Sequence, residues 1–420
     1  MWTRRAFMKS GGLALFSVSI GGTPLFLSRV ANAALNPGLN RRKVLVTIFQ
    51  RGAMDGLMAV TPFNDLMLPK LRPRLAMTAA RSAGESALID LDGTFGFHPA
   101  FASMLPLFQE KRLAIVHGVG SPNPTRSHFD AQDYMETGTP GRKGTRSGWL
   151  NRAVGLLGHE ATPFRAVSMT KALPRSLYGD RPALAIANLA DFGIKAPRNR
   201  GAAENTEQIF KLLYEETSQE LFRRAGQESF EAIKMLSTVE VSNYQPANGA
   251  EYPRSPLGNS LRQIAQLIKA GVGLEVAFAE TGGWDTHVQQ GTINGSFARR
   301  ATDLAQAIVA FWRDVESYHD EVVLMTMTEF GRTVHENGSG GTDHGRGSCL
   351  FVLGNRVDGG KVHGAVPSLV QESLENRRDL PVTTDFRAVF AEVAGKHLDI
   401  RDDQMLFPGW MGQRFPLIQR

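Results

Sequence analysis

The chain of 420 residues contains one cysteine, Cys349. It can therefore form no internal disulfide, and packing alone must hold its core. Cys349 also stands at the start of an apolar segment, where a small buried side chain is the usual role and a nucleophile is the exception.

The chain also lacks a large net positive charge once residues 1–33 are left out. The formal net charge is +6 at pH 7, but residues 1–33 supply Arg4, Arg5, Lys9 and Arg29 and no acid, which leaves +2 for the rest. Such a small surplus gives no electrostatic footprint for nucleic acid, so we expect no nucleic-acid partner. An apolar content of 42% and a charged content of 21% describe a soluble globular protein, and the length suits one large α/β domain.

The N-terminus has the layout of an export signal. The basic segment 3–9 (TRRAFMK) precedes an apolar stretch over 11–27 and then the small residues ANA. This order predicts a twin-arginine signal peptide over residues 1–33, and hence a folded protein delivered to the periplasm or the cell exterior. A membrane anchor is the alternative. Because Gly, Ser and Pro24 interrupt the stretch, we expect no permanent membrane span after cleavage.

Short apolar runs predict the strands of a sheet. Their continuous apolar and β-branched character is typical of strands buried on both faces, as in a parallel sheet covered by helices. The clearest runs are 43–50, 113–119, 274–280, 322–328 and 349–353. Helical periodicity predicts helices over 99–111, 256–270, 296–318 and 385–397. The alternation of strands and helices predicts an α/β fold with a mostly parallel sheet.

The middle of the chain differs from this alternation. Residues 140–255 begin in a Gly- and Arg-rich loop and end in a linker with Pro and Asn. Between these ends we expect short strands over 164–170 and 182–188 and a polar helical tract over 203–238, whose charges mark solvated faces. We therefore predict that this region is an insertion or a cap over the sheet.

Acidic and imidazole side chains gather after the predicted strands. Because the active sites of open α/β sheets lie at the carboxyl ends of the strands, we expect these side chains to converge on one edge. For Asp55, a plain turn or capping role is an equal alternative. The candidate ligands are Asp55, Asp285, His287, Glu329, Asp343 and His344.

This combination of side chains predicts a metal site. Carboxylates and imidazoles without a usable thiolate suit a divalent ion such as zinc, manganese, magnesium or calcium. Two such ions roughly 3.5–4 Å apart would stabilise both the attacking and the leaving oxygen of a displacement at phosphorus or sulfur. One Asp–His pair alone is more often a structural hydrogen bond, so the prediction rests on several polar clusters that each follow a separate strand.

A hydroxyl group follows the second predicted strand. Ser127 or Thr125 is placed to cap a helix that runs toward Tyr134. A hydroxyl at a helix N-terminus and at the carboxyl end of a strand suits a nucleophile, although an ordinary cap is the stronger local alternative. Arg126 and Arg332 are candidates for neutralising the non-bridging oxygens of an ester.

Five segments together resemble a known family. MDGL, PNPTRSHFDAQDYMETG, GGWDTH, TEFGRT and GTDHGRG are similar to segments of the exported bacterial proteins grouped as domain of unknown function 1501, over about residues 43–400. That family is similar to the alkaline phosphatase and sulfatase superfamily. The resemblance implies an alkaline-phosphatase-like α/β fold, with a mostly parallel sheet sandwiched between helices and a two-metal site. Residues 401–420 would form a C-terminal tail.

The resemblance also implies roles for single residues. Asp55 matches a metal-binding aspartate after the first strand, and His344 matches a late histidine ligand. Asp285 and His287 match an Asp-and-His ligand pair, and Glu280 matches an upstream carboxylate.

The chain also departs from the superfamily pattern. Glu329 and Phe330 stand where an Asp-His pair is usual, so one imidazole is missing. Ser127 or Thr125 lies in the segment that bears the nucleophile, but Pro122 stands where sulfatases have their formylglycine precursor. We therefore do not expect a sulfatase that uses this modified residue.

Two functions are compatible with these residues. The first is an exported metal-dependent hydrolase of phosphate or sulfate esters, with a small-molecule or polymer-borne substrate. The second is a catalytically inactive periplasmic binding or assembly protein that keeps the fold. Members of the family are often encoded beside another exported family, so a co-exported protein partner is conceivable. The clusters at the strand ends favour the hydrolase, and the missing imidazole favours the binding protein.

Overall fold

A nine-stranded sheet forms the centre of the part of the chain that the structure describes. The structure is a computed structural model and describes residues 41–78, 87–159, 161–191 and 244–419; the predicted signal peptide lies outside them. The strands are β1 (Val44–Gln50), β5 (Leu113–Gly120), β6 (Ala166–Ser168), β7 (Leu184–Ala185), β8 (Val276–Thr281), β9 (Val322–Met327), β10 (Ser348–Leu353), β11 (Lys361–His363) and β12 (Thr384–Asp385). Their order is β11-β5-β10-β9-β1-β8-β6-β7, and β12 pairs with β5.

The central strands run in one direction, apart from β10. β1 pairs in parallel with both β8 and β9, and every residue of β1 and of β9 is buried, as expected for strands covered on both faces. β10 is antiparallel to β9 and to β5. The predicted α/β class with a mostly parallel sheet is confirmed. Because β10 runs backwards, the loop between β9 and β10 leaves and re-enters the sheet at the edge where the parallel strands end.

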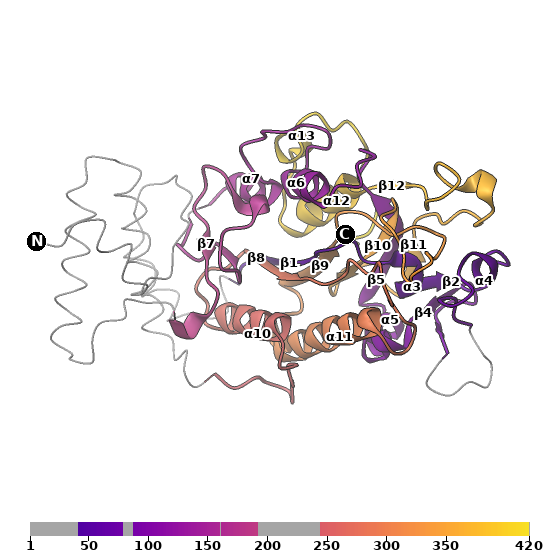
Figure 1. The fold of residues 1–420 in the computed structure, drawn as a ribbon. Coiled ribbons are helices and arrows are strands. Elements are labelled where there is room, and N and C mark those ends of the chain that lie inside the picture. The colour runs from indigo at the N-terminus through magenta and orange to yellow at the C-terminus, as the bar shows by residue number, and fades with distance from the viewer. Residues whose placement is uncertain (1–40, 79–86, 160, 192–243, 420) are drawn as a thin grey trace, which may run out of the picture.

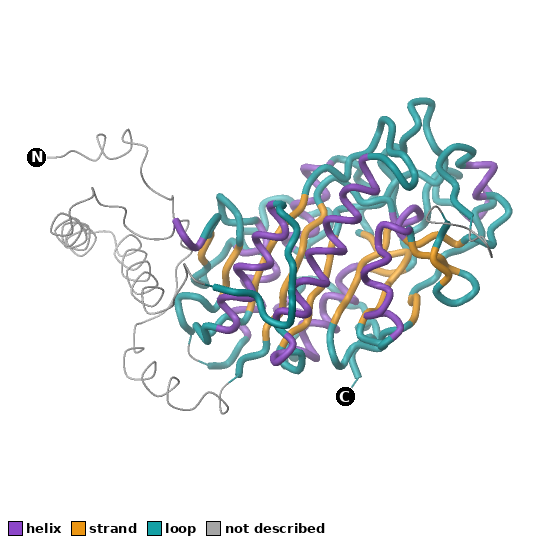
Figure 2. Tube along the Cα trace, turned by 90° about the horizontal axis from the view of Figure 1, so that it is seen from below, coloured by secondary structure: helices purple, strands orange, loops and turns teal. Residues whose placement is uncertain are grey.

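Two layers of helices cover the sheet. One layer contains α6 (His128–Thr137), α7 (Trp149–Leu156), α12 (Phe386–His397) and α13 (Asp403–Leu406), and the other contains α5 (Leu105–Gln109), α10 (Pro256–Lys269) and α11 (Ser296–Asp314). Figure 1 shows the layers above and below the sheet, and Figure 2 shows the lower helices lying over the sheet and running along its strands. Each layer has its own apolar cluster: Ile264 and Phe311 pack below, and Trp149 and Phe390 pack above.

The predicted helices are present with small shifts of their ends. α10 begins after Ser255, whose side chain accepts a hydrogen bond from the N–H of Gly258. The helix predicted over 99–111 is instead a 3-10 helix, η1 (Pro99–Met104), followed by α5. Pro106 explains the break, because it has no N–H to continue a helix and is tolerated only in a first turn.

Smaller elements flank the sheet in the described residues. An antiparallel sheet is formed by β2 (Val60–Pro62), β4 (Phe95–Phe97) and β3 (Ile89–Asp90). The short helices are α3 (Gly56–Ala59), α4 (Leu68–Leu71), η2 (Arg175–Leu177), η3 (Leu189–Asp191), η4 (Glu316–Tyr318) and η5 (Gln371–Ser373). Among the helices described, none has the length and apolar character needed to span a membrane.

The described part of the region over 140–255 adds two short strands to the central sheet. β6 pairs in parallel with β8, and β7 pairs in parallel with β6. The strands predicted over 164–170 and 182–188 therefore extend the central sheet, because the open edge of β8 offers them main-chain partners. The helical tract predicted over 203–238 lies outside the described residues.

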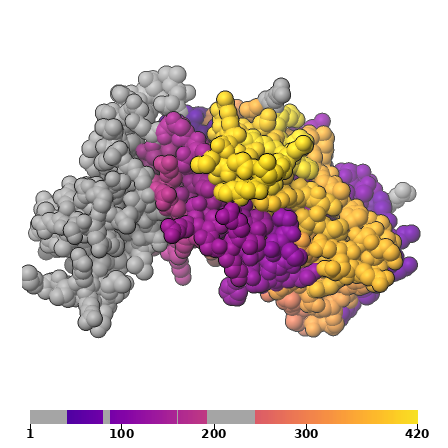
Figure 3. Space-filling model, turned by 90° about the horizontal axis from the view of Figure 1, so that it is seen from above, coloured from indigo at the N-terminus to yellow at the C-terminus, as the bar shows by residue number. Residues whose placement is uncertain are grey.

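The C-terminal tail packs onto the upper layer. Leu406, Leu417 and Ile418 are buried in the same apolar cluster as α7 and α12. Seen from above in Figure 3, this yellow segment lies beside the purple segment that contains α6 and α7. The tail is therefore part of the core of this layer.

Candidate metal centre

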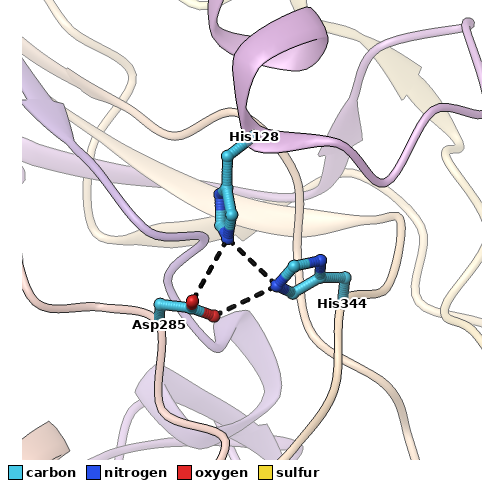
Figure 4. Close-up of side chains that lie close together, drawn as sticks. All are labelled: His128, Asp285 and His344. Atoms are coloured by element: carbon cyan, nitrogen blue, oxygen red, sulfur yellow. Dashed lines mark hydrogen bonds and ion pairs between the residues drawn. The ribbon is translucent and has the colours of Figure 1, made fainter.

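Four side chains meet beyond the carboxyl ends of the parallel strands. His128 is the first residue of α6, which follows β5. Asp285 and His287 lie in the loop after β8, and His344 lies in the loop between β9 and β10. Figure 4 shows His128, Asp285 and His344 pointing toward one another. The structure thus brings together three of the six predicted ligands, with a histidine that sequence reasoning did not select.

The Nε2 atom of His344 lies at the middle of this cluster. It is 3.0 Å from Nε2 of His128 and 2.9 Å from Nε2 of His287. Oδ1 of Asp285 is 3.1 Å from the same atom and 3.0 Å from Nε2 of His287. Oδ2 of Asp285 is 3.4 Å from Nε2 of His128. Three imidazole nitrogens and one carboxylate therefore converge.

The other ring nitrogen of each histidine has an oxygen partner. The pairs are Nδ1 of His128 with Oε1 of Glu329 at 2.8 Å, Nδ1 of His287 with Oδ1 of Asp343 at 2.9 Å, and Nδ1 of His344 with the main-chain oxygen of Arg126 at 2.8 Å. A neutral imidazole has one N–H, so a proton donated from Nδ1 leaves a lone pair on Nε2. Three converging lone pairs repel one another, and a cation between them turns that repulsion into coordination. Metal-binding histidines are usually oriented in this way.

The donor atoms fit a zinc-like ion. Zinc binds imidazole nitrogen and carboxylate oxygen at about 2.0–2.2 Å, which sets tetrahedral ligands roughly 3.3 Å apart. His128, Asp285 and His344 place their donor atoms 3.0–3.4 Å apart, close to that value, and Nε2 of His287 lies 2.9–3.0 Å from the donors of His344 and Asp285. Asp285 is 42% exposed and His287 38%, so solvent reaches the centre. This exposure suits a catalytic site better than a closed structural one.

The histidine pKa values differ in direction across the cluster. The hydrogen bond with Glu329 raises the pKa of His128 despite its partial burial. Burial lowers the pKa of His344, and the neighbouring charge of His128 lowers it further. The two imidazoles therefore do not favour being protonated together.

Asp285 is held by a buried guanidinium. Nη1 of Arg332 donates to Oδ1 of Asp285 at 2.6 Å, and Nε of Arg332 donates to the hydroxyl of Thr342. Burial works to raise the pKa of Asp285, but the hydrogen bond and charge of Arg332 outweigh it, so the pKa lies below its usual value. The predicted anion-neutralising residue Arg332 instead neutralises the protein's own aspartate.

Glu329 lies behind His128 and is fully buried. Its carboxylate accepts hydrogen bonds from the N–H of Gly52 at 2.8 Å and from the side-chain amide of Gln132 at 2.9 Å. Burial works to raise the pKa of Glu329, but these donors and His128 lower it overall. Glu329 therefore orients a histidine, and Asp343 does the same for His287.

Two glycines allow the loops to approach so closely. Gly52 has a φ of +113°, and a Cβ there would lie 2.6 Å from the main-chain nitrogen of Asp285. A Cβ on Gly345 would lie 2.4 Å from main-chain atoms of Arg332. Any larger side chain at these positions would push apart the segments that carry the cluster.

Asp55 is not brought to the cluster, and its predicted ligand role is corrected here. Its carboxylate forms an ion pair with Arg72 at 2.8 and 3.1 Å, and both side chains are buried. It also caps α3 by accepting from the N–H of Met58, and it accepts from the amide of Gln290. The capping alternative is the one that the structure contains.

The nucleophile segment lies next to the centre. Ser127 directly precedes His128; its side chain is exposed and makes no capping hydrogen bond. The hydroxyl of Thr125 accepts from the N–H of Ser127. The guanidinium of Arg126 is paired with Asp379, so this arginine reaches the centre only through its main-chain oxygen.

Glu280 also has another partner. Its carboxylate is 2.6 Å from Nε of Arg51, so the upstream carboxylate implied by the resemblance is part of an ion pair.

His128 is the functional residue that sequence reasoning missed. The signal was present, because it follows a buried strand and opens a helix, as expected for a site residue. Its partner His344 is 216 positions away, and only the fold brings the two rings together.

The fold and the cluster define an α/β protein with a candidate metal centre at the carboxyl edge of its sheet. The chain belongs to the family described as protein of unknown function DUF1501, which matches residues 42–407. A comparison with curated proteins finds no match.

Solved structures with a similar arrangement share little sequence with the chain. The C-terminal periplasmic domain of EcEptC from Escherichia coli, in complex with Zn, is 9% identical, with 75% of this chain and 73% of that chain covered and a TM-score of 0.35. Ps i-CgsB in complex with k-i-k-neocarrahexaose is 8% identical, with 88% and 75% covered and a TM-score of 0.39. BT1596, a 2-O GAG sulfatase, is 8% identical, with 90% and 76% covered and a TM-score of 0.31.

Proposed function

We propose that the chain is an exported hydrolase of phosphate or sulfate esters that depends on one divalent cation. Zinc fits the donors best, and the ligands are His128, Asp285, His287 and His344. The observation that carries this proposal is the convergence of three Nε2 atoms on one carboxylate while every Nδ1 has an oxygen acceptor. Export through the twin-arginine route rests on residues 1–33.

The chemistry divides between the ion and the protein. A bound divalent ion polarises an ester oxygen and lowers the pKa of water. Glu329 and Asp343 keep the protons of two histidines on Nδ1, and Arg332 holds Asp285 ionised. In the net reaction, one water molecule adds across the P–O or S–O bond, and the alcohol leaves with a proton.

Ser127 is the proposed nucleophile. Its hydroxyl is exposed, is bonded to nothing in the described structure, and stands one residue before His128. Thr125 is the weaker choice, because its hydroxyl already accepts a hydrogen bond from the main chain. Attack by Ser127 would transfer the phosphoryl or sulfuryl group to its oxygen, release the alcohol, and leave the second ester to be hydrolysed by water.

A binding or assembly protein of the periplasm is the second candidate. The ion pair of Asp55 with Arg72 favours it, because that pair occupies a carboxylate that a two-metal site would use. A co-exported partner would then bind near the centre, and the ion would serve structure.

Metal analysis of the purified protein is the first test. We expect about one zinc ion per chain, and a loss of affinity of at least about a hundredfold in His344→Ala and Asp285→Ala. His335→Ala is the matched control, because His335 is an exposed histidine in the same loop. Turnover of p-nitrophenyl esters by the loaded protein then separates the two candidates. Bound metal without turnover of any ester would favour the binding protein, and no metal at all would refute the centre.

A further inference from the structure

The charges around the centre balance when a divalent ion is present. The positive charges are those of the ion and of Arg332, which contacts Asp285. The negative charges are those of the three carboxylates Asp285, Glu329 and Asp343. The ion and Arg332 together carry three positive charges, and the carboxylates carry three negative charges. The filled centre therefore has no net positive charge with which to attract an anionic substrate.

Three nearby arginines add nothing to this balance. Each forms an ion pair with carboxylates of the protein: Arg126 with Asp379, Arg346 with Glu375, and Arg51 with Glu280 and Glu136. An arginine in a close ion pair offers a substrate little net attraction, because the carboxylate cancels its charge.

Arg378 is the exception among the described arginines that touch the residues of the centre. Its Nη2 donates to the main-chain oxygen of His344 at 2.8 Å, which holds the guanidinium beside the cluster. The nearest carboxylate, Asp379, is 3.6 Å from its Nε and is already bound by Arg126. The side chain of Arg378 is 42% exposed. Arg126 and Arg378 share the single carboxylate of Asp379, so these three side chains together carry one net positive charge, and Arg378 places it beside the main chain of His344.

We infer that the substrates are esters with a single negative charge, namely phosphodiesters or sulfate monoesters, and that Arg378 is the residue that selects them. This inference rests on the proposed function. A singly charged ester matches the one available cation, whereas a phosphate monoester carries a second charge that this site leaves uncompensated. A site that selects dianions would offer a second ion or another free guanidinium or ammonium group.

Three esters with the same leaving group test this selection. Methyl p-nitrophenyl phosphate and p-nitrophenyl sulfate carry one charge, and p-nitrophenyl phosphate carries two at about pH 8. For the metal-loaded protein we expect kcat/KM to be at least about tenfold higher for one or both singly charged esters. The ratio of kcat/KM for methyl p-nitrophenyl phosphate to kcat/KM for p-nitrophenyl sulfate then shows whether the protein prefers phosphodiesters or sulfate esters.

Variants assign the preference to Arg378. Arg378→Ala should lower kcat/KM for the singly charged esters about tenfold or more, mainly through KM, at unchanged metal content. Arg378→Lys should restore part of the loss. Arg377→Ala is the matched control, because it removes the same charge from an exposed neighbouring side chain.

If turnover is too slow to measure, the affinity of the protein for singly and doubly charged ligands tests the same inference. Calorimetry on the metal-loaded protein would compare dimethyl phosphate and methyl sulfate with methyl phosphate, which has two charges. Tighter binding or faster turnover of the doubly charged ligand would overturn the inference and leave the hydrolase proposal standing. Equal effects of Arg378→Ala and Arg377→Ala would overturn the role of Arg378. A protein without bound metal would refute the proposed function, and the inference would fail with it.

Discussion

Arg332 donates a 2.6 Å hydrogen bond to Asp285. The side chain of Arg332 is fully buried, whereas that of Asp285 is 42% exposed. The buried partner cannot move without losing its bonds to Thr342, so it fixes the position of the exposed one. The hydroxyl of Thr342 in turn donates to Gln290, whose amide donates to Asp55. One candidate ligand is therefore anchored to a hydrogen-bond chain that begins deep in the protein.

The rigidity of this anchor predicts the effect of Arg332→Lys. Lysine keeps the charge but lacks the planar fork that reaches Asp285 and Thr342 together. We expect zinc affinity to fall about 10–100-fold, as for other residues that orient a ligand, with an unchanged ratio of one ion per chain at saturation. Competition with a chelator measures this affinity. Arg74→Lys, at an exposed arginine that pairs with Glu336, is the control and should bind zinc as the unaltered protein does.

Glu329 and Asp343 each orient a histidine of the centre, and they differ in burial, so their variants compare a buried carboxylate with an exposed one. Glu329→Gln removes a carboxylate that is fully buried and leaves its N–H donors with a poorer acceptor. Asp343 is 50% exposed, so water can replace its carboxylate in Asp343→Asn. We expect a loss of zinc affinity of about 10–100-fold for Glu329→Gln and a smaller loss for Asp343→Asn. Equal losses would show that burial does not decide the strength of this support.

Asp55→Asn separates the structural role of Asp55 from a ligand role. The change leaves the charge of Arg72 buried and unpaired, which typically costs about 3–5 kcal/mol of unfolding free energy. Urea unfolding measures this loss, and Asp358→Asn, at an exposed pair with Lys361, should change stability by less than about 1 kcal/mol. Metal analysis of folded Asp55→Asn should still find one ion per chain. A lower ratio would restore Asp55 to the ligand set.

The strands could be predicted because the residues of each strand indicate by themselves that the strand is buried. Val44–Gln50 and Val322–Met327 are continuous apolar runs, and a strand covered on both faces needs nothing else. The positions of Asp285, His287 and His344 followed from the same reasoning, since the first two lie just after β8 and His344 lies just before β10. Boundaries were accurate to one or two residues wherever a cap such as Ser255 or Asp385 marks them.

The pairings of the site could not be predicted in the same way. Asp55 and His128 look alike in the sequence, because each is a polar residue in the segment that connects a buried strand to a helix. What separates them is a partner far along the chain: Arg72 for Asp55 and His344 for His128. Which distant loop reaches a given strand end depends on the order of strands in the sheet, and a single sequence does not contain that order. The same holds for the strands expected over 164–170 and 182–188: their pairing with the free edge of β8 depends on the strand order, which the sequence does not contain.

Ser127→Ala tests the nucleophile within the hydrolase proposal. The hydroxyl has no structural bond in the described residues, so its removal should leave stability and metal content unchanged. We expect turnover to fall at least about a hundredfold, because the other nearby hydroxyl, that of Thr125, is engaged by the main chain. Thr125→Ala is the matched control and should retain most of the activity. If Ser127→Ala remains fully active, water attacks the ester directly and Ser127 only begins α6.

His117 predicts how stability depends on pH away from the centre. It is fully buried within β5, where its ring contacts the main chain of Val60 and Gly118. Burial lowers the pKa of His117 from 6.5 to about 4. Between these values the unfolded chain binds a proton that the folded protein does not. The stabilisation is therefore complete above pH 6.5 and is lost as the pH falls toward 4.

This difference can be measured against His117→Gln, whose side chain keeps hydrogen-bonding groups but does not titrate. Urea unfolding of the two metal-free proteins at pH 7 and pH 5 removes the contribution of bound metal, and the other titrating groups cancel in the comparison. We expect the unaltered protein to lose about 2 kcal/mol more than His117→Gln over this interval. Equal losses would mean that the ring is protonated in the folded state, and that the interior of β5 admits water or an unrecognised counter-charge.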